Sequence, residues 1–126
     1  MALAFLTDEQ ISYIVAEQVQ GKRPDIPITS VRVWHEGTFQ GKADVNLLRV
    51  AATAGLTLVT YDRKTIPPLL TEWGSTGEAH AGVLFVDNLT VPQGDIGGLV
   101  RALIQHWDLT CAWEWTNVVS FLRAAQ

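Results

Sequence analysis

Short apolar runs alternate along this chain with longer stretches whose apolar residues recur at helical spacing. A buried strand reads as a short apolar run, whereas a helix places apolar residues three or four positions apart. The runs occupy residues 3–7, 28–34, 56–60 and 83–86, with a less regular fifth run at 116–122. Parallel neighbours in a sheet need a connection that crosses over, usually through a helix. The alternation therefore predicts an α/β fold, a three-layer α/β/α sandwich around a mostly parallel sheet of about five strands, with right-handed crossovers.

Capping residues predict where the helices begin. Thr7 and Gln10 have the spacing of a capping box ahead of the first helix. Asp44 is a natural N-cap for the second helix, and Asp95 is one for the last and most amphipathic helix. Two prolines are tolerated in a first helical turn, so a short helix is expected at residues 69–73.

The composition is that of a folded protein of one domain. The chain has 126 residues, of which 48% are hydrophobic and 17% charged, enough to bury a full core. Cys111 is the only cysteine, which excludes a disulfide or a zinc–cysteine cluster within the chain. No apolar run approaches the roughly 20 residues that cross a membrane, and the first residues lack the basic stretch of a signal peptide. We therefore expect one domain over residues 1–126, in the cytoplasm and without membrane contact.

Charge is divided unevenly between the two halves of the chain. Residues 1–64 carry seven basic and seven acidic groups, whereas residues 65–126 carry two basic and six acidic groups. The net charge of −4 therefore lies in the second half. This distribution argues against a broad nucleic-acid-binding face, so a polyanion would have to bind locally, near basic residues such as Arg63 and Lys64.

Acidic residues follow the ends of the predicted strands. Open parallel sheets bind ligands outside the carboxyl ends of their strands, so the residues after each apolar run are the first candidates for a site. Six carboxylates fall there or at the start of the next helix, namely Asp8, Glu9, Glu36, Asp44, Asp62 and Asp87. Carboxylates that lie close together repel one another, and a cation relieves that repulsion. Because no histidine or cysteine set accompanies them, Mg²⁺ or Mn²⁺ is the expected metal.

Each of these acids also has a structural interpretation. Asp8 and Glu9 suit the first turn of a helix, where the helix dipole favours negative charge, and Asp44 suits an N-cap. Asp87 suits the start of a turn. The number of acids at one edge of the sheet, rather than any single one, favours a site.

The order of these motifs resembles that of the PIN-like proteins, specifically the small stand-alone ones. Asp44 opens a helix, Gly55 ends it, and an apolar strand follows at once and closes with Thr-x-Asp at residues 60–62. Residues 5–9 resemble the N-terminal strand of those proteins with its Asp-Glu pair, and residues 80–84 resemble the His-x-Gly start of their fourth strand. The resemblance covers most of the chain, up to about residue 105.

This resemblance implies a metal-dependent nuclease, often acting on RNA and often the toxin of a toxin–antitoxin pair. It implies that Asp8, Asp44 and Asp62 hold Mg²⁺ or Mn²⁺ for phosphodiester hydrolysis, with Glu9 or Asp87 as a further ligand. An antitoxin-like protein is then a candidate partner, and RNA the expected substrate.

The chain departs from the family pattern at two places. The family usually follows Thr-x-Asp with a further acid and a phenylalanine, whereas Arg63 and Lys64 stand here. Asp87 and Asn88 replace the basic residue that is common near the end of the fourth strand. Arg63 and Lys64 are therefore the candidates to bind a substrate phosphate.

Two other function classes remain open. A catalytically weak domain of the same fold would serve as an association module, as a homodimer or with an antitoxin-like partner. Trp113 and Trp115 lie two positions apart, so an extended strand would give them one aromatic surface for such a partner. A response-regulator receiver domain shares the acidic pair and the later aspartate, but residues 121–123 do not provide the lysine that it carries after its last strand.

Overall fold

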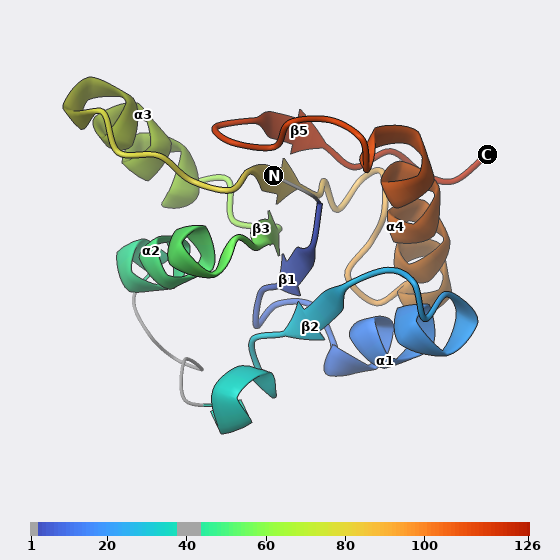
Figure 1. The fold of residues 1–126 in the computed structure, drawn as a ribbon. Helices are drawn as coiled ribbons and strands as arrows, with labels where there is room; N and C mark the ends of the chain where they lie inside the picture. The colour runs from blue at the N-terminus through green and yellow to red at the C-terminus, as the bar shows by residue number, and fades with distance from the viewer. Residues whose placement is uncertain (1–2, 38–43) are drawn as a thin grey trace.

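Five parallel strands form one sheet at the centre of the molecule (Figure 1). The structure is a computed structural model that describes residues 3–37 and 44–126. Every neighbouring pair of strands is parallel, and their order across the sheet is β2-β1-β3-β4-β5. The strands are β1 (Phe5–Thr7), β2 (Ile28–Ser30), β3 (Thr57–Thr60), β4 (Val83–Phe85) and β5 (Val119–Phe121).

Helices cover both faces of this sheet, which confirms the predicted α/β/α fold class. One face carries α1 and α4, and the other carries α2 and α3 (Figure 1). Side chains alternate along each strand, so Phe5 packs under the first pair of helices and Leu6 under the second. None of the helices in residues 3–37 and 44–126 combines the length and apolar character that a membrane crossing requires. The helices are α1 (Tyr13–Lys22), α2 (Asp44–Ala54), α3 (Ile66–Thr76) and α4 (Ile96–Thr110).

One crossover has the opposite hand from the other three. From β1 the chain moves toward the β2 edge of the sheet, and the connecting helix α1 lies on one face. From β2 it moves back toward the β5 edge, first to β3 and then to β4, and the helices α2 and α3 of these connections lie on the other face. From β4 to β5 it continues in the same direction, yet α4 packs beside α1. This connection therefore departs from the expected common hand. As a result, Val119 and Phe121, on the face of α2 and α3, stay 45% and 52% exposed.

The second predicted strand is shorter than residues 28–34. β2 ends at Ser30, and a turn leads into a 3₁₀ helix, η1 (Trp34–Gly37). His35 and Glu36 have φ values of 49° and 59°. The strand is already broken at the turn after Ser30, where the backbone N–H of Val33 donates to the carbonyl of Ser30 at 3.0 Å, and the left-handed residues that follow prevent a strand from resuming despite the β propensity of the run.

The first helix begins later than the capping box predicts. Ser12 is the N-cap of α1, and its hydroxyl accepts a hydrogen bond from the backbone N–H of Ile14 at 3.3 Å. Thr7 is instead the last residue of β1, so its predicted capping role with Gln10 is wrong. The N-cap at Asp95 is confirmed, because its carboxylate accepts from the N–H of Gly98 at 2.9 Å.

The third helix is longer than the predicted 69–73. α3 begins at Ile66, with Pro67 in its first turn, where a missing N–H removes no helical hydrogen bond. It ends at Thr76 and is capped by Gly77, whose φ of 78° is the left-handed conformation typical of a helix C-terminus. The predicted helix is too short because the glycine and serine residues that follow Trp73 have low helix propensity.

Trp113 and Trp115 do not form a shared aromatic surface. Trp115 is fully buried, and its indole N–H donates to the carbonyl of Thr110 at 2.9 Å. Trp113 is 50% exposed, and its ring stacks on that of Trp115 with centroids 5.8 Å apart. The segment between α4 and β5 turns instead of running extended, so the predicted common orientation is wrong.

Gly82 lets the start of β4 pass close to Trp115. Its φ is 101°, and a Cβ atom there would lie 2.7 Å from Cε3 of that ring. We expect Gly82→Ala to lower the free energy of unfolding by about 2–4 kcal/mol, because it combines backbone strain with overpacking.

The matched control is Gly74→Ala, since Gly74 lies within α3 and has no atom within 4 Å of its Cβ position. This change is expected to raise the free energy of unfolding by about 0.5–1 kcal/mol. Urea titrations of both variants measure the two effects. A Gly82→Ala protein as stable as the parent chain would contradict this packing.

Candidate functional site

The buried carboxyl group of Asp8 lies at the carboxyl edge of the sheet. Asp8 follows β1 directly and is 7% exposed. Its Oδ2 accepts a hydrogen bond from the hydroxyl of Thr60 at 2.7 Å, and its Oδ1 accepts one from the backbone N–H of Glu9 at 2.6 Å. No lysine or arginine of the described ranges forms an ion pair with it. Two hydrogen bonds leave acceptor positions on a carboxylate for a cation.

Thr60 links Asp8 to Asp62. The register pairs Thr7 with Val59, so the next residue of each strand emerges at the same place on the edge. The hydroxyl oxygen of Thr60 accepts a hydrogen bond from the backbone N–H of Asp62 at 2.9 Å. One buried side chain therefore connects two of the predicted metal ligands, which follow neighbouring strands.

Asp62 also begins α3. Its Oδ1 accepts hydrogen bonds from the backbone N–H groups of Lys64 and Thr65, both at 2.9 Å. Thr65 stands at the N-cap position but makes no side-chain capping bond. The half-buried carboxyl group of Asp62 thus orders the start of the helix, while the backbone N–H of the same residue joins the Asp8–Thr60 network.

Asp87 lies against Arg63. Nη1 of Arg63 is 3.5 Å from Oδ2 of Asp87, and its Cζ is 5.3 Å from the ring centroid of Phe121. The other carboxylate oxygen of Asp87 accepts from the backbone N–H of Leu89 at 2.9 Å. The predicted ligand after β4 and the predicted phosphate-binding residue after β3 therefore contact each other, and Asp87 orients the guanidinium group.

The remaining acids are distributed around this edge. The backbone carbonyl of Glu9 accepts hydrogen bonds from the guanidinium group of Arg32 at 2.9 and 3.2 Å. Glu36 is exposed on η1. Asp44 is the first residue of α2, and its side chain lies outside the described residues. Within the described part of the chain, no three histidine, cysteine, aspartate or glutamate side chains form a metal-binding group.

A cavity of about 430 Å³ opens over the ends of β3 and β4. Its Tyr61 donates a hydrogen bond to the carbonyl of Val91 at 2.7 Å, and burial, reinforced by Asp95, raises the pKa of this phenol to about 12. The phenol of Tyr61 is therefore protonated at neutral pH, and its side chain lines one side of the cavity. The lining carries two carboxylates, two cations and three amides, so it suits a polar ligand. The lining is Gln10, Tyr61, Asp62, Arg63, Lys64, Val86, Asp87, Asn88 and Gln93.

Sequence reasoning missed Thr60 and the amides of Gln10 and Gln93. Thr60 belongs to the Thr-x-Asp motif, which could have indicated it. A pattern made of carboxylates alone does not include its hydroxyl group. Gln10 and Gln93 are brought to the cavity by folding, from loops after β1 and β4. No local pattern marks either residue.

Comparisons of the chain with family models, with curated proteins and with solved structures find no match. The PIN-like resemblance therefore rests on the ordered motifs of the sequence. The function has to be argued from the geometry of the carboxyl edge.

Thr60→Val tests the link between the two acids. The change keeps the shape of the side chain but removes the donor to Asp8 and the acceptor of the Asp62 N–H, so we expect it to cost about 2–4 kcal/mol of unfolding free energy. Thr57→Val is the control, because Thr57 is equally buried and donates to an uncharged acceptor, the carbonyl of Ala81, at 2.7 Å. Its expected cost is about 1–2 kcal/mol. Equal losses in urea unfolding would argue against a special role of the Asp8 contact.

Proposed function

We propose that this chain is a Mg²⁺- or Mn²⁺-dependent nuclease that hydrolyses phosphodiester bonds, with RNA as its substrate. The observation that carries the proposal is the link from buried Asp8 through Thr60 to Asp62, at the carboxyl ends of two neighbouring parallel strands. Sheets of this kind bind ligands at that edge. The PIN-like order of the motifs supports the same reaction.

The donor set suits a hard divalent cation. Asp8 and Asp62 offer carboxylate oxygens, and the described lining of the adjoining cavity includes neither histidine nor cysteine. Proteins hold Mg²⁺ with as few as one or two carboxylates, while water and substrate phosphate complete the coordination. In this proposal Asp44 is the third ligand, at the start of α2. The hydrogen bonds from Thr60 and Glu9 fix the orientation of the Asp8 carboxyl group.

The chain's own residues bind and orient the substrate. A divalent ion at this edge would polarise the phosphate and lower the pKa of an attacking water. Arg63 lines the cavity and is held between Asp87 and the ring of Phe121, so its guanidinium group is placed to bind a phosphate oxygen. Lys64 adds a second, exposed cation beside it.

The charge distribution implies a short contact with RNA. Arg63 and Lys64 form a small basic pair on a chain of net charge −4. Such a surface neutralises few phosphates, so binding would depend only weakly on salt. The amides of Gln10, Asn88 and Gln93 would supply the other contacts, to sugar or base groups.

Asp62→Asn is the decisive variant because its amide oxygen can still cap α3. We expect it to weaken Mn²⁺ binding, followed by electron paramagnetic resonance, at least ~10-fold, and to slow hydrolysis of a labelled single-stranded RNA at least ~100-fold. Asp8→Asn should act in the same way. Asp25→Asn is the control, since Asp25 is an exposed acid that pairs with Arg23 at 2.9 Å.

The proposal fails if the parent chain binds no Mn²⁺ and cleaves neither RNA nor DNA with Mg²⁺ or Mn²⁺. It also fails if Asp62→Asn and Asp25→Asn behave alike. Metal binding without cleavage of either nucleic acid would favour the alternative, a domain of this fold that acts through association.

A further inference from the structure

The outer edge of β5 has backbone groups that face away from the sheet. The carbonyl of Val118 accepts from the N–H of Val83 at 2.9 Å, and the N–H of Leu122 donates to the carbonyl of Phe85 at 2.8 Å. Backbone groups alternate in direction along a strand, so those of the residues between, Val119 and Phe121, point away from β4. Among the described residues, none hydrogen-bonds to these outward groups.

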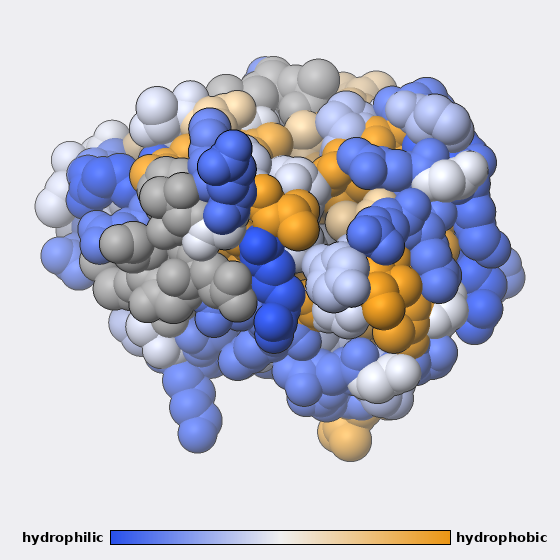
Figure 2. Space-filling model, turned by 90° about the horizontal axis from the view of Figure 1, so that it is seen from below, coloured by the Kyte–Doolittle hydropathy of each residue, from blue (hydrophilic) through white to orange (hydrophobic). Residues whose placement is uncertain are grey.

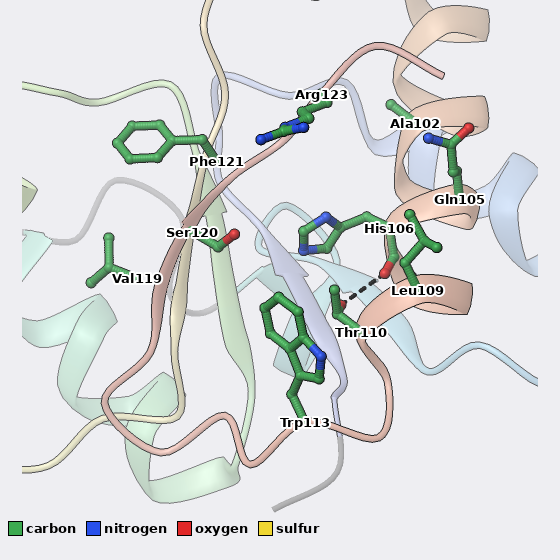
Figure 3. Close-up of a pocket in the computed structure, with 10 residues that line it drawn as sticks. All are labelled: Ala102, Gln105, His106, Leu109, Thr110, Trp113, Val119, Ser120, Phe121 and Arg123. Carbon is green, nitrogen blue, oxygen red and sulfur yellow. Dashed lines mark hydrogen bonds between the residues drawn. The ribbon is translucent and has the colours of Figure 1, made fainter. Parts of the chain in front are cut away.

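Apolar side chains surround this open edge. Val119 and Phe121 are 45% and 52% exposed, although their neighbours in register, Val83 and Phe85, are buried. On the other side of the strand, between β5 and α4, lies a cavity of about 400 Å³ whose rim includes Trp113. Figure 3 shows the side chain of Ser120 directed toward this cavity and those of Val119 and Phe121 directed away from it. An exposed apolar edge strand is a template for pairing with another strand.

The opposite edge of the sheet is protected. Pro27 directly precedes β2, and the outward carbonyl of Ile28 accepts a hydrogen bond from the side chain of Gln20 at 2.7 Å. Ile28 and Ser30 are also buried. Figure 2 views the molecule from this side, and hydrophilic side chains occupy most of the face it shows. The two edges of one sheet therefore differ, and β5 is the one open to pairing.

We propose that β5 pairs antiparallel with β5 of a second copy of this chain, about a two-fold axis at Ser120. With the axis there, Val119 of each copy lies opposite Phe121 of the other. Both residues have outward backbone groups, so each pair exchanges its N–H···O bonds as a hydrogen-bonded pair of an antiparallel ladder requires. The β-branched and aromatic side chains then pack across the new boundary.

Charge favours a second copy as the partner. Residues 115–122 carry no charge, with Glu114 at one end and Arg123 at the other. Antiparallel pairing about Ser120 places Arg123 of each strand opposite the uncharged Asn117 of its partner, so no like charges face each other along the paired strands. A two-fold contact also closes on itself, so the assembly stops at two chains joined in one continuous sheet.

Sedimentation velocity over a range of concentrations tests the pairing. The parent chain is expected to form a dimer, and Val119→Lys is expected to raise the dimer dissociation constant at least ~10-fold, because the charge enters the contact twice. Val33→Lys is the matched control, since Val33 is 55% exposed but lies beyond β2. Circular dichroism confirms that both variants are folded. A monomeric parent chain, or a dimer that Val119→Lys leaves unchanged, would overturn the proposal.

A disulfide trap tests the register. Ser120→Cys, made together with Cys111→Ala, is expected to cross-link on oxidation, because the two Ser120 residues face each other at the axis as a closely spaced pair. Thr29→Cys in the same background is the control, as the half-buried middle residue of the other edge strand. Cross-linking through Thr29→Cys instead, or assemblies larger than two chains, would refute the two-fold β5 contact. These readouts do not depend on metal binding or nuclease activity.

Discussion

The pairing of β1 with β3, with Thr7 beside Val59, determines where the reactive groups of this protein lie. Because the two strands run in the same direction and end together, Asp8 and Thr60 emerge side by side. A slip of one residue would turn every side chain of one strand to the opposite face and break their hydrogen bond. The buried side chains of Leu6 and Leu58, which belong to the same core, hold this register.

The fold could be predicted wherever the pattern was local and periodic. The alternation of apolar runs and helical stretches was enough for the number of strands, their parallel direction and the helix that follows Asp95. The turn after Ser30, which ends β2 early, is formed by residues that also suit a strand and leaves no mark in the sequence. The hand of the β4–α4–β5 crossover could not be predicted either, because it depends on the packing of α4 against α1, which lies far away in the sequence.

The candidate site could be predicted in its acids but not in their connections. Asp8 and Asp62 could be predicted because open parallel sheets bind ligands at the carboxyl ends of their strands, and both residues follow such an end. Their link through Thr60 is a matter of register, and the contact of Asp87 with Arg63 depends on how two loops face each other. Trp115 shows the same limit, because spacing alone does not tell a buried indole from an exposed one.

The packing of α1 beside α4 places the first and last helices of the chain over one core. During synthesis the ribosome releases Val15 and Val19 well before Leu99 and Leu103, which complete their surroundings. Until the C-terminal segment emerges, the nascent protein keeps one face of its sheet open to water and to chaperones. The packing of this face is therefore completed only after α4 has been synthesised, and truncation before α4 would leave an aggregation-prone remnant.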